Sequence, residues 1–176
     1  MRRGRGTERP TDIMPRTFQL KTRLFVARDL ETTFAFFADA GNLQRLTPAF
    51  LNFRILTPQP IPMRQGALID YRIRIHGIPV WWKTEIAEWN PPHQFVDQQL
   101  RGPYWLWHHT HTFTPVDGGT MVEDTVRYRP IGGALMHTLF VKRDLERIFL
   151  FRQEEILRVF DVPARDPITV EFSRED

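Results

Sequence analysis

Two histidines and two aspartates near the middle of the chain are the residue types that acid–base or metal chemistry requires. His109 and His111 are separated by one residue within a predicted strand. Because side chains alternate across a β-strand, both imidazoles would lie on one face, about 7 Å apart along the backbone. Asp97 and Asp124 fall on the predicted strands before and after this one. The sequence therefore predicts that imidazoles and carboxylates meet on one face of a sheet.

Three interpretations of this cluster are open. The two histidines with Asp97 or Asp124 could form a His-His-carboxylate metal site. Alternatively, His109 or His111 could pair with Asp124 as a catalytic acid–base dyad, since a carboxylate can orient an imidazole as a base. The third interpretation is a hydrogen-bonded network that satisfies polar groups buried in the sheet. We favour the network, because no further protein ligand at metal spacing is evident, and we predict no metal and no other cofactor.

A β-hairpin would hold these residues, with strands at about 104–114 and 120–128 and a turn at 117–119. The side chains expected on the facing sides are Trp105, Trp107, His109, His111 and Phe113 on one strand, and Val122, Asp124, Val126 and Tyr128 on the other. An ordinary core would be purely aliphatic, whereas a ligand cavity mixes apolar walls with a few polar groups. This face is therefore predicted to line a cavity.

Periodicity and turn residues predict the remaining elements. They are strands at 18–24, 51–56, 67–76, 80–88 and 95–100, helices at 30–39 and 42–47, and a long helix at 134–160. Apolar and charged residues alternate along 67–76, so one face of the antiparallel sheet is exposed and the other is covered. The long helix is the only predicted element long enough to cover it, and a curved sheet around that helix leaves a cavity.

The composition is that of one globular domain. Of 176 residues, 41% are hydrophobic and 26% are charged, which is enough to bury a core. We predict a disordered basic arm at 1–16, a domain at 17–162 and a loose polar tail at 163–176, with a short extended piece at 168–172. The absence of cysteine excludes disulfides and suits the cytoplasm, where we place the protein.

Two classes of partner are not expected. No apolar run approaches the length of a transmembrane helix. The net charge is only +3 and depends on the arginines of the basic arm, so we predict no specific nucleic-acid binding.

Four motifs in this order resemble the START-like, or helix-grip, superfamily of polyketide cyclases and dehydrases, birch-pollen-allergen-like proteins and lipid-transfer domains. They are closest to a bacterial ligand-binding group: N-L-x-x-L-T-P at 42–48, F-x-D-x-Q-x-x-G-P-Y at 95–104, W-x-H-x-H-x-F at 107–113 and G-G-T-x-x-x-D-x-V-x-Y at 118–128. The resemblance covers about 18–160. It implies an α+β fold in which a curved antiparallel sheet wraps around a long C-terminal helix, with two short helices after the first strand.

The resemblance implies a hydrophobic cavity but no particular reaction, because the superfamily holds binders, transporters and enzymes on one scaffold. We expect the protein to bind a small aromatic or acyl molecule without catalysis. The alternative is a cyclase/dehydratase-like or hydrolase enzyme that uses His109 or His111 with Asp124. A third possibility, a protein-interaction module, would show a large apolar surface patch and no internal void.

The predicted ligand-binding residues lie on the inner sheet face and the long helix. They are Tyr71, Ile73, Trp82, Asp97, Gln99, Trp107, His109, His111, Phe113, Asp124, Tyr128, Leu145, Phe149 and Arg152. Arg152 is expected to pair with Asp124, and Trp81 and Trp89 are expected at the surface or an edge. Similar domains are sometimes fused to epimerase-like domains, so a separate epimerase-like partner is predicted, with the chain as a monomer or homodimer.

Overall fold

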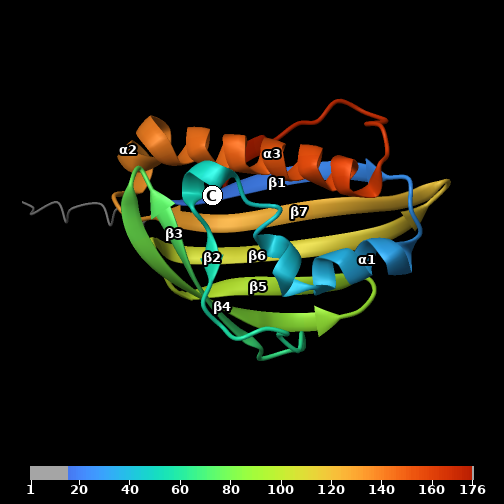
Figure 1. Ribbon diagram of the computed structural model, residues 1–176. Coiled ribbons are helices and arrows are strands. Elements are labelled where there is room, and N and C mark those ends of the chain that lie inside the picture. Colours follow the sequence, from blue (N-terminus) through green and yellow to red (C-terminus); the bar gives the residue numbers. More distant parts are fainter. Residues whose placement is uncertain (1–15, 176) are drawn as a thin grey trace, which may run out of the picture.

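A curved antiparallel sheet of eight strands, in the order β2-β3-β4-β5-β6-β7-β1-β8, dominates the computed structural model (Figure 1). The structure describes residues 16–175, so the predicted arm lies outside them except for Arg16. The strands are β1 (Thr17–Val26), β2 (Arg54–Ile55), β3 (Leu68–Ile75), β4 (Ile78–Asn90), β5 (Gln94–Arg101), β6 (Tyr104–Val116), β7 (Gly119–Pro130) and β8 (Glu171–Glu175). Strands β3 to β7 are joined in sequence by hairpins, and β1 pairs with β7.

The predicted α+β architecture is confirmed: one long helix near the C-terminus covers the inner face of the sheet (Figure 1). Helix α1 (Leu30–Ala38) begins at Asp29, whose side chain accepts a hydrogen bond from Thr32 N at 2.8 Å. The long helix consists of α2 (Gly133–Met136), a π-helical turn (His137–Val141) and α3 (Lys142–Phe160). Its buried face carries Leu145, Phe149, Arg152, Ile156 and Phe160.

The strand pairing brings the polar residues of four strands together. His111 on β6 is directly opposite Asp124 on β7, and His109 is opposite Asp97 on β5. Thr22 on β1 faces Asp124 from the other side. The structure therefore has the predicted pairing, in which a histidine lies opposite Asp124 across the β6–β7 hairpin.

A β-bulge at the start of β6 corrects the predicted position of one tryptophan. The register shifts between Tyr104 and Leu106, and a bulge reverses the alternation of side chains beyond it. Trp105 is consequently 74% exposed, and the prediction that it shares the face of Trp107 was wrong. Tyr104 takes the inward position instead and packs on Trp107.

A second bulge, in β4, places another tryptophan inside. The register shifts between Ile86 and Glu88, so Trp89 turns toward the inner face and packs on Phe34 and Phe95. The prediction that Trp89 lies at the surface or an edge was wrong. Trp81, which precedes the bulge, is 63% exposed, as predicted.

Three shorter elements also differ from the prediction. The helix predicted at 42–47 is a 3-10 turn at Ala40–Leu43, and the strand predicted at 51–56 shrinks to β2, because Ala49–Leu51 forms another 3-10 turn. The tail is not loose throughout: β8 pairs with β1 and extends the sheet by one strand. Residue 172, at the end of the predicted extended piece, lies in β8, opposite Leu20.

Candidate functional site: a cavity between the sheet and helix α3

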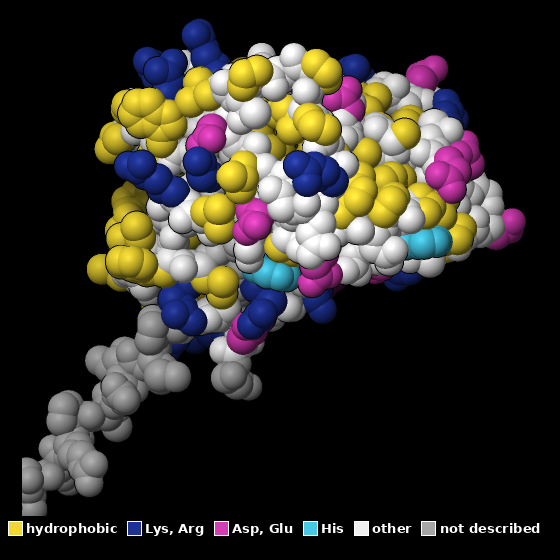
Figure 2. Space-filling view, turned by 90° about the horizontal axis from the view of Figure 1, so that it is seen from below, with side chains coloured by type: hydrophobic (Ala, Val, Ile, Leu, Met, Phe, Trp, Pro, Cys, Tyr) yellow, Lys and Arg dark blue, Asp and Glu magenta, His cyan; other side chains and the backbone are white. Residues whose placement is uncertain are grey.

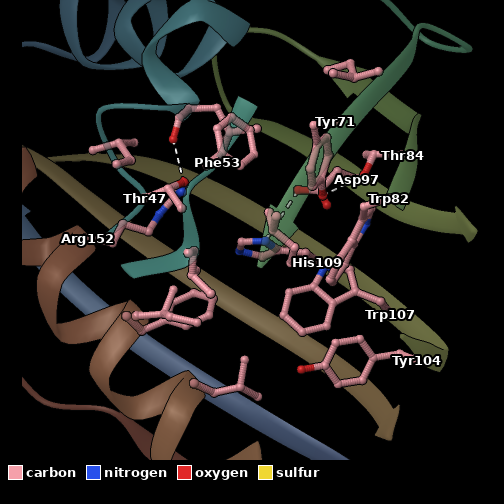
Figure 3. A pocket seen from close by; sticks show the side chains of 18 of the residues that line it. Thr47, Phe53, Tyr71, Trp82, Thr84, Asp97, Tyr104, Trp107, His109 and Arg152 are labelled. Atoms are coloured by element: carbon pink, nitrogen blue, oxygen red, sulfur yellow. Dashed lines mark hydrogen bonds and ion pairs between the residues drawn. The ribbon is translucent and has the colours of Figure 1, made fainter. Parts of the chain in front are cut away.

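The interior is not filled uniformly between the sheet and the long helix. At the α1 end, a cluster that includes Phe34, Phe37, Phe113 and Ile156 forms a packed core. Toward the α2 end, the structure encloses a cavity of about 540 Å³, lined by β3, β4, β5 and β6, by α3 and by residues between Asp39 and Phe53 (Figure 3).

The cavity wall is mainly aromatic and aliphatic. Tyr71 and Trp82 stack with ring centroids 5.7 Å apart, and Trp107 meets Trp82 edge to face at 5.3 Å. Tyr104 packs on Trp107 at 4.9 Å and extends this wall toward the mouth (Figure 3). Large rings with defined packing make a rigid apolar surface for a guest molecule.

Five polar side chains, four of them buried and Asp97 half-buried, form a network across the sheet at the cavity wall. His109 Nε2 lies 3.0 Å from Asp124 Oδ1, and His109 Nδ1 lies 3.4 Å from Asp97 Oδ2. His111 Nε2 lies 2.9 Å from Asp97 Oδ2, and its Nδ1 lies 2.8 Å from Asp124 Oδ1 at an angle outside hydrogen-bond geometry. Arg152 Nε approaches Asp124 Oδ2 at 3.6 Å, which is the internal pair that the sequence predicts.

The two carboxylates of the network are ionised. Burial alone would raise the pKa of Asp124, but the Arg152 guanidinium, the hydrogen bond from His109 and the close His111 imidazole hold it well below its ordinary value. Burial also opposes ionisation of Asp97, but the nearby imidazoles and Arg152 outweigh it and lower the pKa of that carboxyl. An ionised carboxylate only accepts hydrogen bonds, so the imidazole nitrogens must donate them.

The two histidines differ in protonation. Burial and the neighbouring His111 lower the pKa of His109. Burial would lower the pKa of His111 too, but its contacts with Asp124 and Asp97 outweigh burial and raise it. His111 is therefore the ring that takes up a second proton more readily, while His109 is the ring that stays neutral and donates from Nε2. When His111 is protonated, it and Arg152 balance the two aspartates, so the network carries no net charge.

Most of the predicted site residues do meet at the cavity. Those that line it are Tyr71, Ile73, Trp82, Asp97, Trp107, His109, His111, Leu145, Phe149 and Arg152. They come from five different elements, which the hairpin register and α3 bring to one place.

The other four predicted residues do not line the cavity. Asp124 lies behind the imidazoles, and Phe113 belongs to the packed core. Tyr128 contacts His137 Nε2 at 2.9 Å. Gln99 forms two hydrogen bonds with the backbone of Tyr104, where it holds the β5–β6 turn.

Other lining residues were missed in the sequence. Leu46, Leu51 and Phe53 come from the connection between α1 and β3, whose path depends on tertiary packing. Tyr104 stands in the G-P-Y motif, which was a usable signal, but the bulge after it hid its inward direction. Met136 and Phe140 line the cavity from the α2 end because the helix passes over the mouth there.

Asp97, His109 and His111 also offer ligand atoms within 4.8 Å of one another, a spacing that a metal ion could use. The same atoms already make the contacts of the network. A metal would require His111 to lose its proton and both rings to turn away from their carboxylates. The chemistry of the donor set therefore fits the hydrogen-bonded network better than a metal site.

An antiparallel sheet that grips a C-terminal helix over an apolar cavity defines a protein of the helix-grip class. The family model described as polyketide cyclase / dehydrase and lipid transport matches residues 26–150, well over half of the chain. The chain belongs to this family. No curated protein matches the sequence.

Solved structures of similar fold come from several kinds of protein. The Zhui aromatase/cyclase from Streptomyces sp. R1128 has a TM-score of 0.65 at 13% identity, over 82% of this chain and 94% of that one. The major latex-like protein 151 from Panax ginseng has a TM-score of 0.62 at 13% identity, over 84% and 99%. A nucleoside-diphosphate sugar epimerase from Corynebacterium glutamicum has a TM-score of 0.62 at 20% identity, over 80% of this chain but 29% of that one. At these identities the likeness shows the fold alone.

Proposed function

We propose that this protein binds a small hydrophobic molecule, aromatic or acyl, in the cavity between the sheet and α3. The observation that carries the proposal is an enclosed volume of about 540 Å³ with a mainly apolar wall. Sites for small molecules are typically clefts of about 300–1,000 Å³, lined by aromatic side chains with a few placed polar groups. Both the volume and the wall fall within that description.

The network favours a guest whose polar end is neutral. Its four charges already cancel, and a further charge in a buried site costs free energy unless it is paired. Among the described residues, two buried donors near the cavity, Trp82 Nε1 and Arg152 Nε, have no hydrogen-bond acceptor. A carbonyl or hydroxyl oxygen of the guest would supply one. A ketone or phenol therefore suits this site better than a carboxylate.

A second candidate is a cyclase/dehydratase-like or hydrolase enzyme. Its supporting observation is the neutral His109, which lines the cavity and keeps a lone pair on Nδ1 beside Asp97. Such an imidazole can accept a proton from a bound substrate. This candidate would be established if the wild type turned over a substrate and His109→Gln lost turnover but kept its ligand affinity. Binding without turnover by the wild type favours a ligand-binding protein.

Ligand binding is tested with 2-acetylnaphthalene, a neutral ketone that quenches or shifts tryptophan fluorescence when it packs on Trp82 and Trp107. Wild-type protein should bind it saturably. Ile73→Trp, which fills the cavity from β3, should weaken binding about tenfold or more, while Leu68→Trp, at an exposed position on the same strand, should not. Equal binding by all three proteins, or none by the wild type, would refute the proposal.

We infer a monomer or homodimer in the cytoplasm, which the absence of cysteine suits. In the described part of the chain, no helix is both long and apolar enough to cross a membrane. The likeness to part of an epimerase supports an epimerase-like partner protein, which co-purification of the two chains would test.

A further inference from the structure

Exposed hydrophobic side chains gather around the mouth of the cavity. They form what we call the mouth patch: Ile78 at the tip of the β3–β4 hairpin, and Ile131, Leu135, Met136, Leu139 and Phe140 at α2 and the π-helical turn. Leu135 is 68% exposed, Ile78 67% and Leu139 56%. Figure 2 shows hydrophobic side chains at this end of the molecule, with Lys and Arg among them. Exposed apolar patches of this kind mark interaction sites.

The helix at the mouth leaves part of its apolar surface exposed. One of its polar residues, His137, faces inward, where it contacts Tyr128 at 2.9 Å and stacks on Phe18 at 3.6 Å between ring centroids. Leu135 and Leu139, one helical turn apart, face outward. A helix usually buries its apolar side. This one is anchored through its imidazole and presents leucines to the surroundings.

The patch is continuous with the cavity. Ile131, Met136 and Phe140 are partly exposed and also line the cavity. Across the mouth, His76 on the hairpin contacts Asp144 on α3 at 2.7 Å, and its ring packs on Phe140. Whatever covers the patch therefore also faces the opening through which a guest enters.

Cations outnumber exposed carboxylates around the patch. Lys142, Arg143 and Arg147 are exposed on the first turns of α3, directly after the patch, where Glu146 is the exposed carboxylate. Arg74 is exposed on the opposite hairpin, and the acidic Asp144 between these cations is engaged by His76.

The sequence before β1 continues this basic character. It carries Arg2, Arg3, Arg5, Arg9 and Arg16. It joins β1 at the same end of the sheet, because Phe18 pairs with Tyr128 near the end of β7. An apolar centre with basic surroundings complements an anionic lipid surface, where leucines enter the acyl boundary and cations meet head groups.

We propose that the mouth patch docks on an anionic lipid surface, so that the cavity opens toward the lipid and not toward water. A hydrophobic guest could then pass between bilayer and cavity without crossing water. The inference goes beyond ligand binding and does not depend on the identity of the ligand.

The test is co-sedimentation of the full chain with vesicles of phosphatidylcholine alone, or of phosphatidylcholine with about a third phosphatidylglycerol. Wild-type protein should bind the anionic vesicles, and binding should fall as salt is raised. The double variant Leu135→Ser and Leu139→Ser should bind about tenfold less. Its matched control is Leu56→Ser with Leu68→Ser, which removes two exposed leucines outside the patch and should bind as the wild type does.

Several outcomes would overturn the proposal. They are no vesicle binding by the wild type, equal binding by the Leu135/Leu139 variant, or equal binding to neutral and anionic vesicles. The proposal would also be overturned if the wild type were a dimer in ultracentrifugation and the Leu135/Leu139 variant a monomer. The patch would then bind a second copy of the chain. The cavity-filled Ile73→Trp protein should still bind vesicles, which separates a failure of docking from a failure of ligand binding.

Discussion

The imidazole rings of His109 and His111 lie with their centroids 3.8 Å apart, and each ring contacts the same two carboxylates, those of Asp97 and Asp124. Two cations at this distance in a buried site would repel strongly. The opposite pKa shifts of the two rings favour an arrangement that avoids this, in which His111 takes up a second ring proton and His109 stays neutral. The pair behaves as a unit that holds one proton more than two neutral imidazoles do.

This shared proton predicts how stability depends on pH. In the unfolded chain both histidines titrate near their ordinary pKa of about 6.5. Above that pH the folded state still holds the extra proton on His111. The stability that this proton contributes is lost as pH rises through the raised pKa of His111. Below it the unfolded chain takes up a second proton, so stability falls as pH drops toward the lowered pKa of His109. The contribution of the pair is therefore largest near pH ~6.5.

The measurement is urea unfolding from about pH 5 to about pH 8 on the wild type and on the His109→Gln, His111→Gln double variant. The difference in unfolding free energy should pass through a maximum. A difference that rises or falls steadily over the range would contradict the shared proton. The aspartates do not disturb this window, because their lowered pKa values keep them ionised throughout.

Replacing Arg152 by methionine should destabilise the protein by about 3–5 kcal/mol, because it leaves the buried Asp124 without its cationic partner. Arg143→Met, at an exposed position on the same helix, should change stability by less than about 0.5 kcal/mol. Equilibrium unfolding in urea measures both. Adding Asp124→Asn to Arg152→Met should recover part of the loss; no recovery would mean that the arginine acts by packing alone.

A ligand that brings a negative charge should bring a proton with it. 2-Naphthoate resembles 2-acetylnaphthalene in shape but is an anion, and the neutral network can balance it only if His109 becomes protonated. Its affinity should rise as pH falls, while that of the ketone stays flat.

Calorimetry in two buffers of different ionisation enthalpy counts the protons taken up. We expect about one for the naphthoate, none for the ketone, and none for the naphthoate with His109→Gln. Proton uptake that persists in the variant would assign it to another group.

The bulge in β4 predicts unequal costs for two tryptophans of that strand. Trp89→Ala should destabilise by about 3–5 kcal/mol, because the ring packs on Phe34 and Phe95. Trp81→Ala should cost less than about 0.5 kcal/mol, because its ring is mostly exposed. Thermal and urea unfolding of both variants measure this. Similar losses for the two would show that alternation continues through β4 without a bulge.

The same residues show what could be predicted from the sequence. The placement of a histidine beside Asp124 followed from alternation and the Asp117-Gly118-Gly119 turn, although the choice between His109 and His111 stayed open. The pairing of Arg152 followed from a charge among apolar helix positions. Trp105 and Trp89 were misplaced because a bulge adds one residue and reverses alternation, and no residue type announces it. Leu46 and Phe53 were missed because loops are placed by the surfaces against which they pack, which local sequence does not encode.

Gln99 and Tyr128 show a related limit. Both were correctly expected on strands beside the site, but their partners, the Tyr104 backbone and His137, satisfy their polar atoms away from the cavity wall. Strand alternation gives the face of a side chain. It does not give the nearest hydrogen-bond partner on that face.

The central claim is that a guest molecule occupies the space between the sheet and α3. Nuclear Overhauser contacts between 2-acetylnaphthalene and the methyl groups of the protein test it most directly. The account predicts contacts from the bound ring to Ile73, Leu145 and Ile148, which line the cavity, and none to the exposed Leu56. Contacts confined to Leu135 and Leu139 at the surface, or none at all at saturating ketone, would contradict it.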